Sequence, residues 1–157
     1  MLLIQYASWP FLAVSSKWKT LDGSKPHIYA HRGEPVLMPE ETIPAYEVAS
    51  ILGAEYVETD LVLTKDNRLV CHHDLYLSSN TDVQEHPEFD HLIRRTPDGS
   101  ADWYVRDFTL AELKILKVVQ QKVGIRPEYL NYFGIPTFEE FLDTVHRMTF
   151  KLNRTIG

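Results

Sequence analysis

Four pairs of ionisable residues follow short apolar runs in the first half of the chain, in a pattern that could bind a cation and a phosphoryl group. They are His31-Arg32, Glu40-Glu41, Glu58 with Asp60, and His73-Asp74. In a parallel α/β fold the carboxyl ends of the strands meet at one edge, and active sites gather there. We therefore expect these four pairs to lie together at such an edge.

The two carboxylates Glu58 and Asp60 are two residues apart in a run that favours a β-strand, so we expect their side chains to point the same way. Two ionised carboxylates on one buried face repel each other unless a cation lies between them. A hard divalent cation such as Ca²⁺ or Mg²⁺ prefers oxygen ligands and would offset this repulsion. The alternative is an exposed strand edge on which both carboxylates are simply hydrated.

The two histidines His31 and His73 each end an apolar run and suit acid–base chemistry near neutral pH. Hydrolysis of a phosphodiester needs one group to activate the attacking oxygen and another to protonate the leaving oxygen. Arg32 offers a planar fork to a phosphoryl oxygen, and a metal ion could polarise the same group. The alternative for each histidine is a purely structural hydrogen bond, and the spacing does not choose between His72 and His73.

The elements that must position these residues follow from the apolar pattern. Residues 27–30 favour a strand ended at Gly33, and residues from about 42 to 52 approximate a helical period that Gly53 would end. Residues 56–63 favour a second strand, and residues 68–72 a third short one. Two strands alternating with a helix make a βαβ unit, which favours a parallel α/β architecture.

The segment from about residue 75 to residue 107 breaks this pattern with prolines, a glycine and scattered charges. A connection of this length in a compact domain favours an active-site insertion over a structureless loop. Capping-box patterns at residues 109–112 and 137–140 then predict two helix starts. The apolar positions expected to pack are Leu113, Leu116 and Val119 in the first helix and Phe138, Phe141, Leu142 and Val145 in the second.

The composition indicates a globular chain, because 44% of its 157 residues are hydrophobic and 24% are charged. The formal net charge of −6, with no cluster of Lys and Arg, disfavours a nucleic-acid partner. A single cysteine, Cys71, excludes an intrachain disulfide and a cysteine-rich zinc site.

Residues 1–16 are largely apolar but lack a basic start and are interrupted by polar residues. This segment is either a poorly formed signal peptide or an N-terminal flap, and it is too short for a membrane-spanning helix of ~20 residues. The segment therefore does not decide between two locations of the protein: the secretory pathway or periplasm, and the cytoplasm. We expect residues 1–26 to be an N-terminal segment and linker, and residues 27–157 to carry the catalytic domain.

An ordered set of motifs resembles the glycerophosphodiester phosphodiesterase family, in the subgroup with an insertion after the second strand. The matching motifs are His31-Arg32-Gly33, Pro39-Glu40-Glu41-Thr42, Ala45-Tyr46, Gly53-Ala54, Glu58-Thr59-Asp60, Leu63-Thr64-Lys65-Asp66 and His73-Asp74. The resemblance implies part of a TIM (β/α)₈ barrel, with N-terminal β/α units and that insertion. It also implies hydrolysis of small-molecule glycerophosphodiesters to sn-glycerol 3-phosphate and an alcohol.

The resemblance also implies roles for single residues. His31 and His73 would be the general acid–base pair, Arg32 a phosphate contact, and Glu58 and Asp60 ligands of Ca²⁺ or Mg²⁺. Glu40 would support these ligands. The substrate's own glycerol hydroxyl is expected to attack phosphorus, giving a cyclic phosphate that water then opens.

The sequence departs from the family pattern in two respects. Glu41 stands where the common pattern has Asn, a change that we expect to be tolerated. A (β/α)₈ barrel takes ~250 residues, so only two to three β/α units fit here, and the family's third metal-ligating Glu is expected beyond Gly157. We therefore expect a truncated chain that is inactive by itself.

Two alternatives share these residues. A phospholipase D-like or sphingomyelinase D-like enzyme has the same histidines and carboxylates but acts on membrane lipids. A non-catalytic relative would bind a phosphodiester or a protein partner without turning it over.

Overall fold

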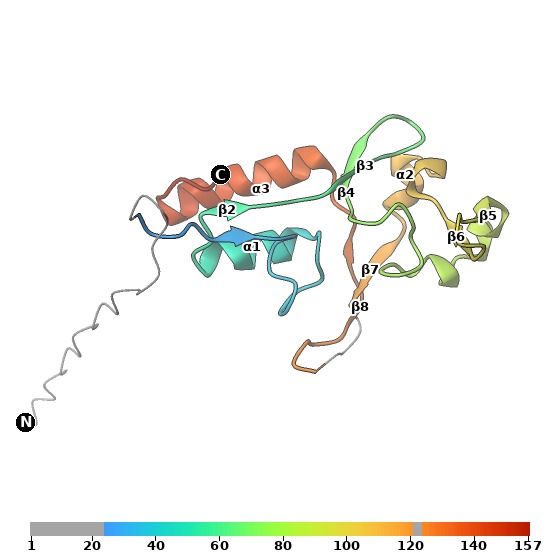
Figure 1. Ribbon diagram of the computed structural model, residues 1–157. Helices are drawn as coiled ribbons and strands as arrows, with labels where there is room; N and C mark the ends of the chain where they lie inside the picture. Colours follow the sequence, from blue (N-terminus) through green and yellow to red (C-terminus); the bar gives the residue numbers. More distant parts are fainter. Residues whose placement is uncertain (1–23, 121–123) are drawn as a thin grey trace, which may run out of the picture.

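The computed structural model describes residues 24–120 and 124–157, and Figure 1 shows its elements. The strands are β1 (Tyr29–Ala30), β2 (Tyr56–Val57), β3 (Leu61–Leu63), β4 (Leu69–Cys71), β5 (Ile93–Arg95), β6 (Ala101–Trp103), β7 (Lys117–Gln120) and β8 (Tyr129–Gly134). The helices are α1 (Ile43–Ile51), α2 (Leu110–Leu113) and α3 (Phe138–Leu152), with 3₁₀ turns η1 (Val83–Glu85), η2 (Pro87–Leu92) and η3 (Val105–Asp107).

The residues of the N-terminal segment on which the signal-peptide and flap interpretations depend lie outside the described part of the chain. Within the described part, no helix has the length and apolar character that crossing a membrane requires.

The expected βαβ unit is present. β1 and β2 pair in parallel, with Tyr29 opposite Tyr56, and α1 connects them. α1 begins after Thr42 with a proline in its first turn, where a missing N–H costs nothing. It ends before Gly53, whose φ of 101° reverses the chain.

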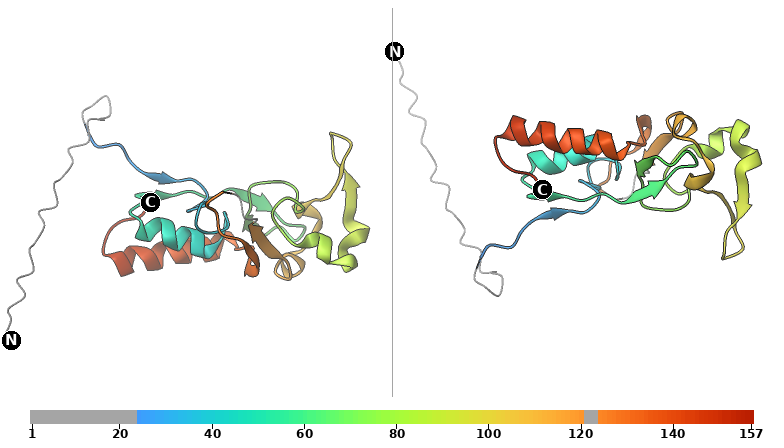
Figure 2. Two further views of the ribbon diagram at one scale, coloured as in Figure 1. Left: turned by 90° about the horizontal axis from the view of Figure 1, so that it is seen from below. Right: turned by 90° about the horizontal axis from the view of Figure 1, so that it is seen from above.

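Helices α1 and α3 lie side by side on one face of the β1–β2 pair (Figure 2). The capping box of α3 forms as the sequence predicts: Thr137 Oγ1 accepts from the Glu140 N–H at 3.2 Å, and Glu140 Oε2 accepts from the Thr137 N–H at 2.8 Å. Phe141 of α3 packs edge-on against Tyr46 of α1. The apolar face is correct at Phe138, Phe141 and Val145, but Leu142 is 48% exposed, so its predicted packing is wrong.

The single strand predicted over residues 56–63 is broken into two. β2 ends at Val57, residues 58–60 are irregular, and β3 turns away to pair antiparallel with β4. The break occurs because side chains take the hydrogen bonds that a continuing ladder would make: Asp60 donates its N–H to Glu41 Oε1. The argument that Glu58 and Asp60 share one face of a strand is therefore wrong, although both still lie next to the end of β2.

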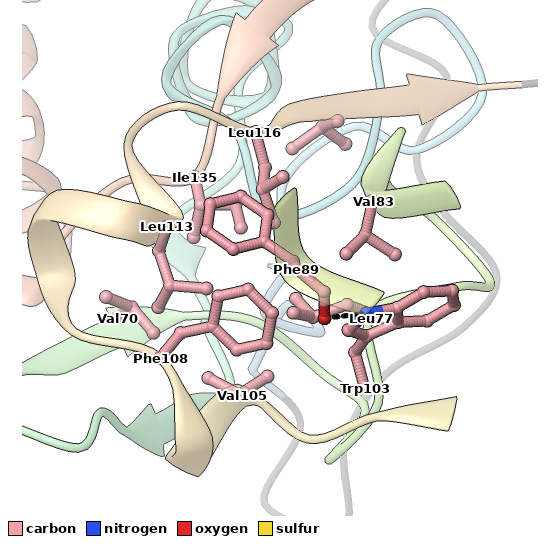
Figure 3. Packing of buried hydrophobic residues seen from close by; sticks show 11 residues of the cluster. Val70, Leu77, Val83, Phe89, Trp103, Val105, Phe108, Leu113, Leu116 and Ile135 are labelled. Atoms are coloured by element: carbon pink, nitrogen blue, oxygen red, sulfur yellow. Dashed lines mark hydrogen bonds between the residues drawn. The ribbon is translucent and has the colours of Figure 1, made fainter. Parts of the chain in front are cut away.

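The insertion expected at about residues 75–107 is folded, and its buried side chains form one core with residues on either side of it. It contains η1, η2, the antiparallel β5–β6 hairpin and η3. Figure 3 shows its buried side chains, among which Trp103 Nε1 donates to the Phe89 carbonyl at 2.9 Å. This cluster also includes residues before and after the insertion, among them Val70 and Ile135.

The first capping box is also correct, but its helix is much shorter than the sequence predicts. α2 ends at Leu113, and Val119 lies in β7, which pairs antiparallel with β8. Alternate residues of β7, Val118 and Gln120, are buried, which is the period of a strand. The local helical period predicts a helix here because it takes no account of the partner strand β8, which begins about ten residues later.

Strand β4 lies between the two cores of the structure. Val70 is buried in the cluster around the insertion, whereas Cys71 is buried with Tyr46 and Phe141 between the helices. Neighbouring residues of a strand point to opposite sides, so β4 serves both cores. The pair His72-His73 follows this strand directly.

Gly33 permits the close approach of the loop after β1 to helix α1. Its φ is 82°, and a Cβ built on it would lie 2.7 Å from the backbone carbon of Ala45. Gly99 has a similar φ of 90°, but its added Cβ would meet nothing within 4 Å.

Replacing Gly33 with Ala should lower the free energy of unfolding by at least about 2 kcal/mol, because the positive φ costs ~1–2 kcal/mol and the methyl group must also displace α1. Gly99→Ala is the matched control and should cost only about 1 kcal/mol, for the φ alone. Urea unfolding followed by circular dichroism measures both losses. Equal losses would contradict the importance of the close approach.

Candidate functional site

Three predicted site residues converge at the carboxyl ends of β1 and β2. One ligand atom from each of His31, Glu58 and Asp60 lies within 4.8 Å of those of the other two. The parallel pairing of the strands explains this, because Ala30 lies opposite Val57 and the chain leaves both strands at the same edge. The structure thus brings the imidazole of His31 next to two carboxylates that lie 27 and 29 residues further along the chain.

Arg32 holds this group together through its backbone and its side chain. Its N–H donates to Glu58 Oε2 at 2.9 Å, Nη1 donates to Glu40 Oε1 at 3.1 Å, and Nε lies 3.2 Å from Asp60 Oδ2. Arg32 has a φ of 60°, a region that is costly for a residue with a side chain. This backbone conformation lets both the N–H and the guanidinium of Arg32 face the same group of carboxylates. Strained residues of this kind are common at functional sites.

The carboxylate of Glu41 braces the segment that carries Asp60. Glu41 is 3% exposed and accepts hydrogen bonds from the Asp60 N–H at 3.0 Å and from the hydroxyls of Tyr46 and Thr59 at 2.6 Å each. Burial raises the pKa of Glu41 above its usual range, and burial likewise raises the pKa of Tyr46. Both groups are fixed between α1 and the segment after β2.

The sequence argument treated Glu41 as a tolerated replacement and gave it no role. The contacts above make it the link between α1 and the cluster of His31, Glu58 and Asp60. The sequence does contain a signal for this role of Glu41. It is a second carboxylate directly after Glu40, at the start of the predicted helix that carries Tyr46.

His72 and His73 differ in burial, a difference that their spacing in the sequence does not reveal. His72 is 2% exposed, its Nδ1 donates to the Asp74 carbonyl at 2.9 Å, and burial lowers its pKa. His73 is exposed and its Nδ1 lies 2.7 Å from Asp74 Oδ1, while Asp74 Oδ2 accepts from the Ser79 hydroxyl at 3.0 Å. A carboxylate that holds Nδ1–H leaves Nε2 of His73 available for proton transfer.

Among the contacts of residues 24–120 and 124–157, none joins His73 directly to His31, Glu58 or Asp60. His27 pairs with Glu55, His86 with Asp82 and Glu88, His91 with the Glu88 carbonyl, and His146 contacts Phe150. These contacts are typical of structural or exposed histidines.

The donor set fits a hard divalent cation. Glu58 and Asp60 offer carboxylate oxygens, and Asp60 Oδ2 is buried without a hydrogen bond. Glu40, Glu58 and Asp60 against the one guanidinium of Arg32 leave two negative charges uncompensated. Oxygen ligands with that surplus are what Ca²⁺ and Mg²⁺ prefer in proteins.

Comparison with known proteins shows the family. Residues 31–157 match the model of the glycerophosphoryl diester phosphodiesterase family, so the chain belongs to that family. It is 38% identical over 151 residues to glycerophosphodiester phosphodiesterase GDPD6 of Arabidopsis thaliana, which covers 90% of this chain and 40% of the relative. It is 33% identical over 141 residues to the glycerophosphodiester phosphodiesterase of Haemophilus influenzae, which covers 83% of this chain and 37% of the relative. The chain thus spans about two fifths of the length of these relatives.

Solved structures agree with the fold. A glycerophosphoryl diester phosphodiesterase from Silicibacter pomeroyi matches with a TM-score of 0.62 at 21% identity, covering 83% of this chain and 43% of that one. A phosphodiesterase from Oleispira antarctica, in complex with the product sn-glycerol-3-phosphate, matches with a TM-score of 0.55 at 27% identity, covering 84% and 43%. The chain is therefore a mixed α/β fold that corresponds to part of these barrel enzymes, and its described strands form no closed barrel.

Replacing Glu41 with Ala should lower the free energy of unfolding by about 2–4 kcal/mol, because the Asp60 N–H and two buried hydroxyls lose their shared acceptor. Glu47→Ala is the matched control on α1: it removes a partly exposed ion pair with Arg147 at 2.7 Å and should cost less than about 1 kcal/mol. Chemical denaturation of both variants measures the difference. A loss at Glu41 no larger than at Glu47 would show that the brace is unimportant.

Proposed function

We propose that the protein carrying this chain hydrolyses glycerophosphodiesters to sn-glycerol 3-phosphate and an alcohol, with a divalent cation. The observation that carries this proposal is the convergence of His31, Glu58 and Asp60 around Arg32, in a chain of this family. The product bound to the Oleispira relative supports the substrate class.

We further propose that residues 27–157 are the N-terminal part of a TIM barrel, with residues 1–26 preceding it and the segment of about 75–107 inserted after the second barrel strand. The parallel β1–β2 pair would contribute the first two barrel strands, and α1 and α3 would lie on the outside. Gly157 supports this order, because it exchanges hydrogen bonds with Glu55 and Val57 on either side of Tyr56, as a third strand would.

Glu58 and Asp60 would hold Ca²⁺ or Mg²⁺, and Glu40 would keep Arg32 in place beside them. When bound, the cation would polarise a phosphoryl oxygen and offset charge that develops on it. Arg32 would contact a second phosphoryl oxygen through its fork. The surplus of negative charge at the cluster fits this role of the cation.

The two histidines would divide the proton transfers. His31 lies beside the carboxylate pair and would take the proton of the attacking oxygen. His73, whose Nδ1 is held by Asp74, would donate a proton from Nε2 to the leaving alcohol. Asp74, itself fixed by Ser79, would keep His73 in the tautomer that this step needs.

Addition of EDTA should abolish release of glycerol 3-phosphate from glycerophosphocholine, and Ca²⁺ or Mg²⁺ in excess should restore it, because two of the proposed ligands are hard carboxylates. A coupled assay for glycerol 3-phosphate measures both rates. An unchanged rate in the chelator would remove the cation from the mechanism.

Replacing His31 or His73 with Ala should each lower kcat by at least ~100-fold, because each would remove one proton-transfer group. His91→Ala is the matched control, since His91 is exposed and hydrogen-bonds to the Glu88 carbonyl of its own 3₁₀ turn, and it should leave kcat unchanged. Rates near that of the unaltered protein for either site variant would remove that histidine from the pair.

The same product assay separates the alternatives. Release of product only from lysophosphatidylcholine or sphingomyelin would indicate the phospholipase D-like or sphingomyelinase D-like activity. Binding of glycerophosphodiesters without turnover would indicate a non-catalytic relative.

A further inference from the structure

A cavity of about 240 Å³ lies between the loop that follows β1 and the segment that carries the insertion. Its wall includes Glu40 on one side and Ser79, Asn80, Gln120 and Arg126 on the other. Hydrogen bonds hold the second side together, because the Val119 N–H donates to the Asn80 carbonyl at 2.8 Å and Gln120 Nε2 donates to the Pro127 carbonyl at 3.2 Å. The cavity is therefore built from segments that the hydrogen bonds position.

Two short chains of contacts connect this cavity to the proposed reacting groups. Glu40 on its wall bonds directly to Arg32, the proposed phosphate contact, at 3.1 Å. Ser79 on its opposite wall bonds to Asp74 at 3.0 Å, and Asp74 holds His73, the proposed donor to the leaving oxygen, at 2.7 Å. The cavity thus adjoins the groups that would handle the phosphoryl group and the leaving alcohol.

We propose that this cavity is the subsite for the leaving alcohol of the phosphodiester and that it takes a small, uncharged polyol such as glycerol. The inference rests on the proposed function and adds the class of substrate to it. The attacking oxygen forms a bond to phosphorus and gives its proton to His31, while the bond between phosphorus and the alcohol oxygen breaks and that oxygen receives the proton from Nε2 of His73.

The size and lining of the cavity select this class. Clefts that enclose drug-sized ligands measure roughly 300–1,000 Å³, so a cavity of about 240 Å³ suits a short group. Ser79, Asn80 and Gln120 supply neutral hydrogen-bonding groups that suit hydroxyls. Arg126 is the cationic residue of the lining and disfavours a quaternary ammonium group there.

The test compares kcat/KM for glycerophosphoglycerol and for glycerophosphocholine in the protein that carries this chain, with glycerol 3-phosphate as the common product. We expect glycerophosphoglycerol to be preferred by ~10-fold or more, since a site that bonds hydroxyls rejects an analogue lacking them. Arg126→Glu should shift this ratio by ~10-fold toward the choline ester, because the new charge attracts the ammonium group.

Arg95→Glu is the matched control, because Arg95 is an exposed residue of β5 that does not line the cavity, and it should leave the ratio unchanged. A preference for the choline ester in the unaltered protein would overturn the ligand class. Equal shifts in both variants, or none in Arg126→Glu, would overturn the subsite while leaving the proposed function intact. Absence of hydrolysis of both esters would overturn the proposed function and the subsite together.

Discussion

The pairing of one residue, Arg32, with three carboxylates is the interaction on which the site depends. Arg32 reaches Glu58 through its backbone, and Glu40 and Asp60 through its side chain. Opposite charges about 4 Å apart attract by about 4 kcal/mol at the effective dielectric of a protein surface, which is enough to gather acidic residues that would otherwise repel. One positive charge cannot balance three negative ones, so the group retains affinity for a divalent cation.

The sequence predicts the chemistry of this site better than its geometry. The expected residues His31, Glu58 and Asp60 do meet, and the βαβ unit and both capping boxes form where the local pattern places them. The capping boxes depend on contacts three residues apart, and the βαβ unit follows from the order of two strands and a helix along the chain. The break after Val57 was missed because Glu41, 19 residues from Asp60, supplies the competing acceptor.

The β7–β8 hairpin was missed for a related physical reason. Leu116 and Val119 also fit a helical period, and only the partner strand β8 decides between the two periods. The parallel barrel implied by the family cannot be read from local patterns either, since the described strands pair only two by two. The pairing of distant strands stabilises the fold through residues that lie outside any short segment of the sequence, so a local pattern cannot predict it.

The position of β4 between two cores has a consequence for how this chain can change over evolutionary time. Val70 belongs to the core of the insertion and Cys71 to the core of the helices, so the strand transmits disturbance from either core to the histidines that follow it. The cluster around Arg32 belongs to the βαβ unit and meets the end of β4 at Asp60, whose carbonyl accepts from the His72 N–H at 3.1 Å. Drift in the insertion should therefore alter the placement of His73 and the nearby cavity sooner than it alters the acidic cluster, so that proton transfer to the leaving group and the fit of that group would change together.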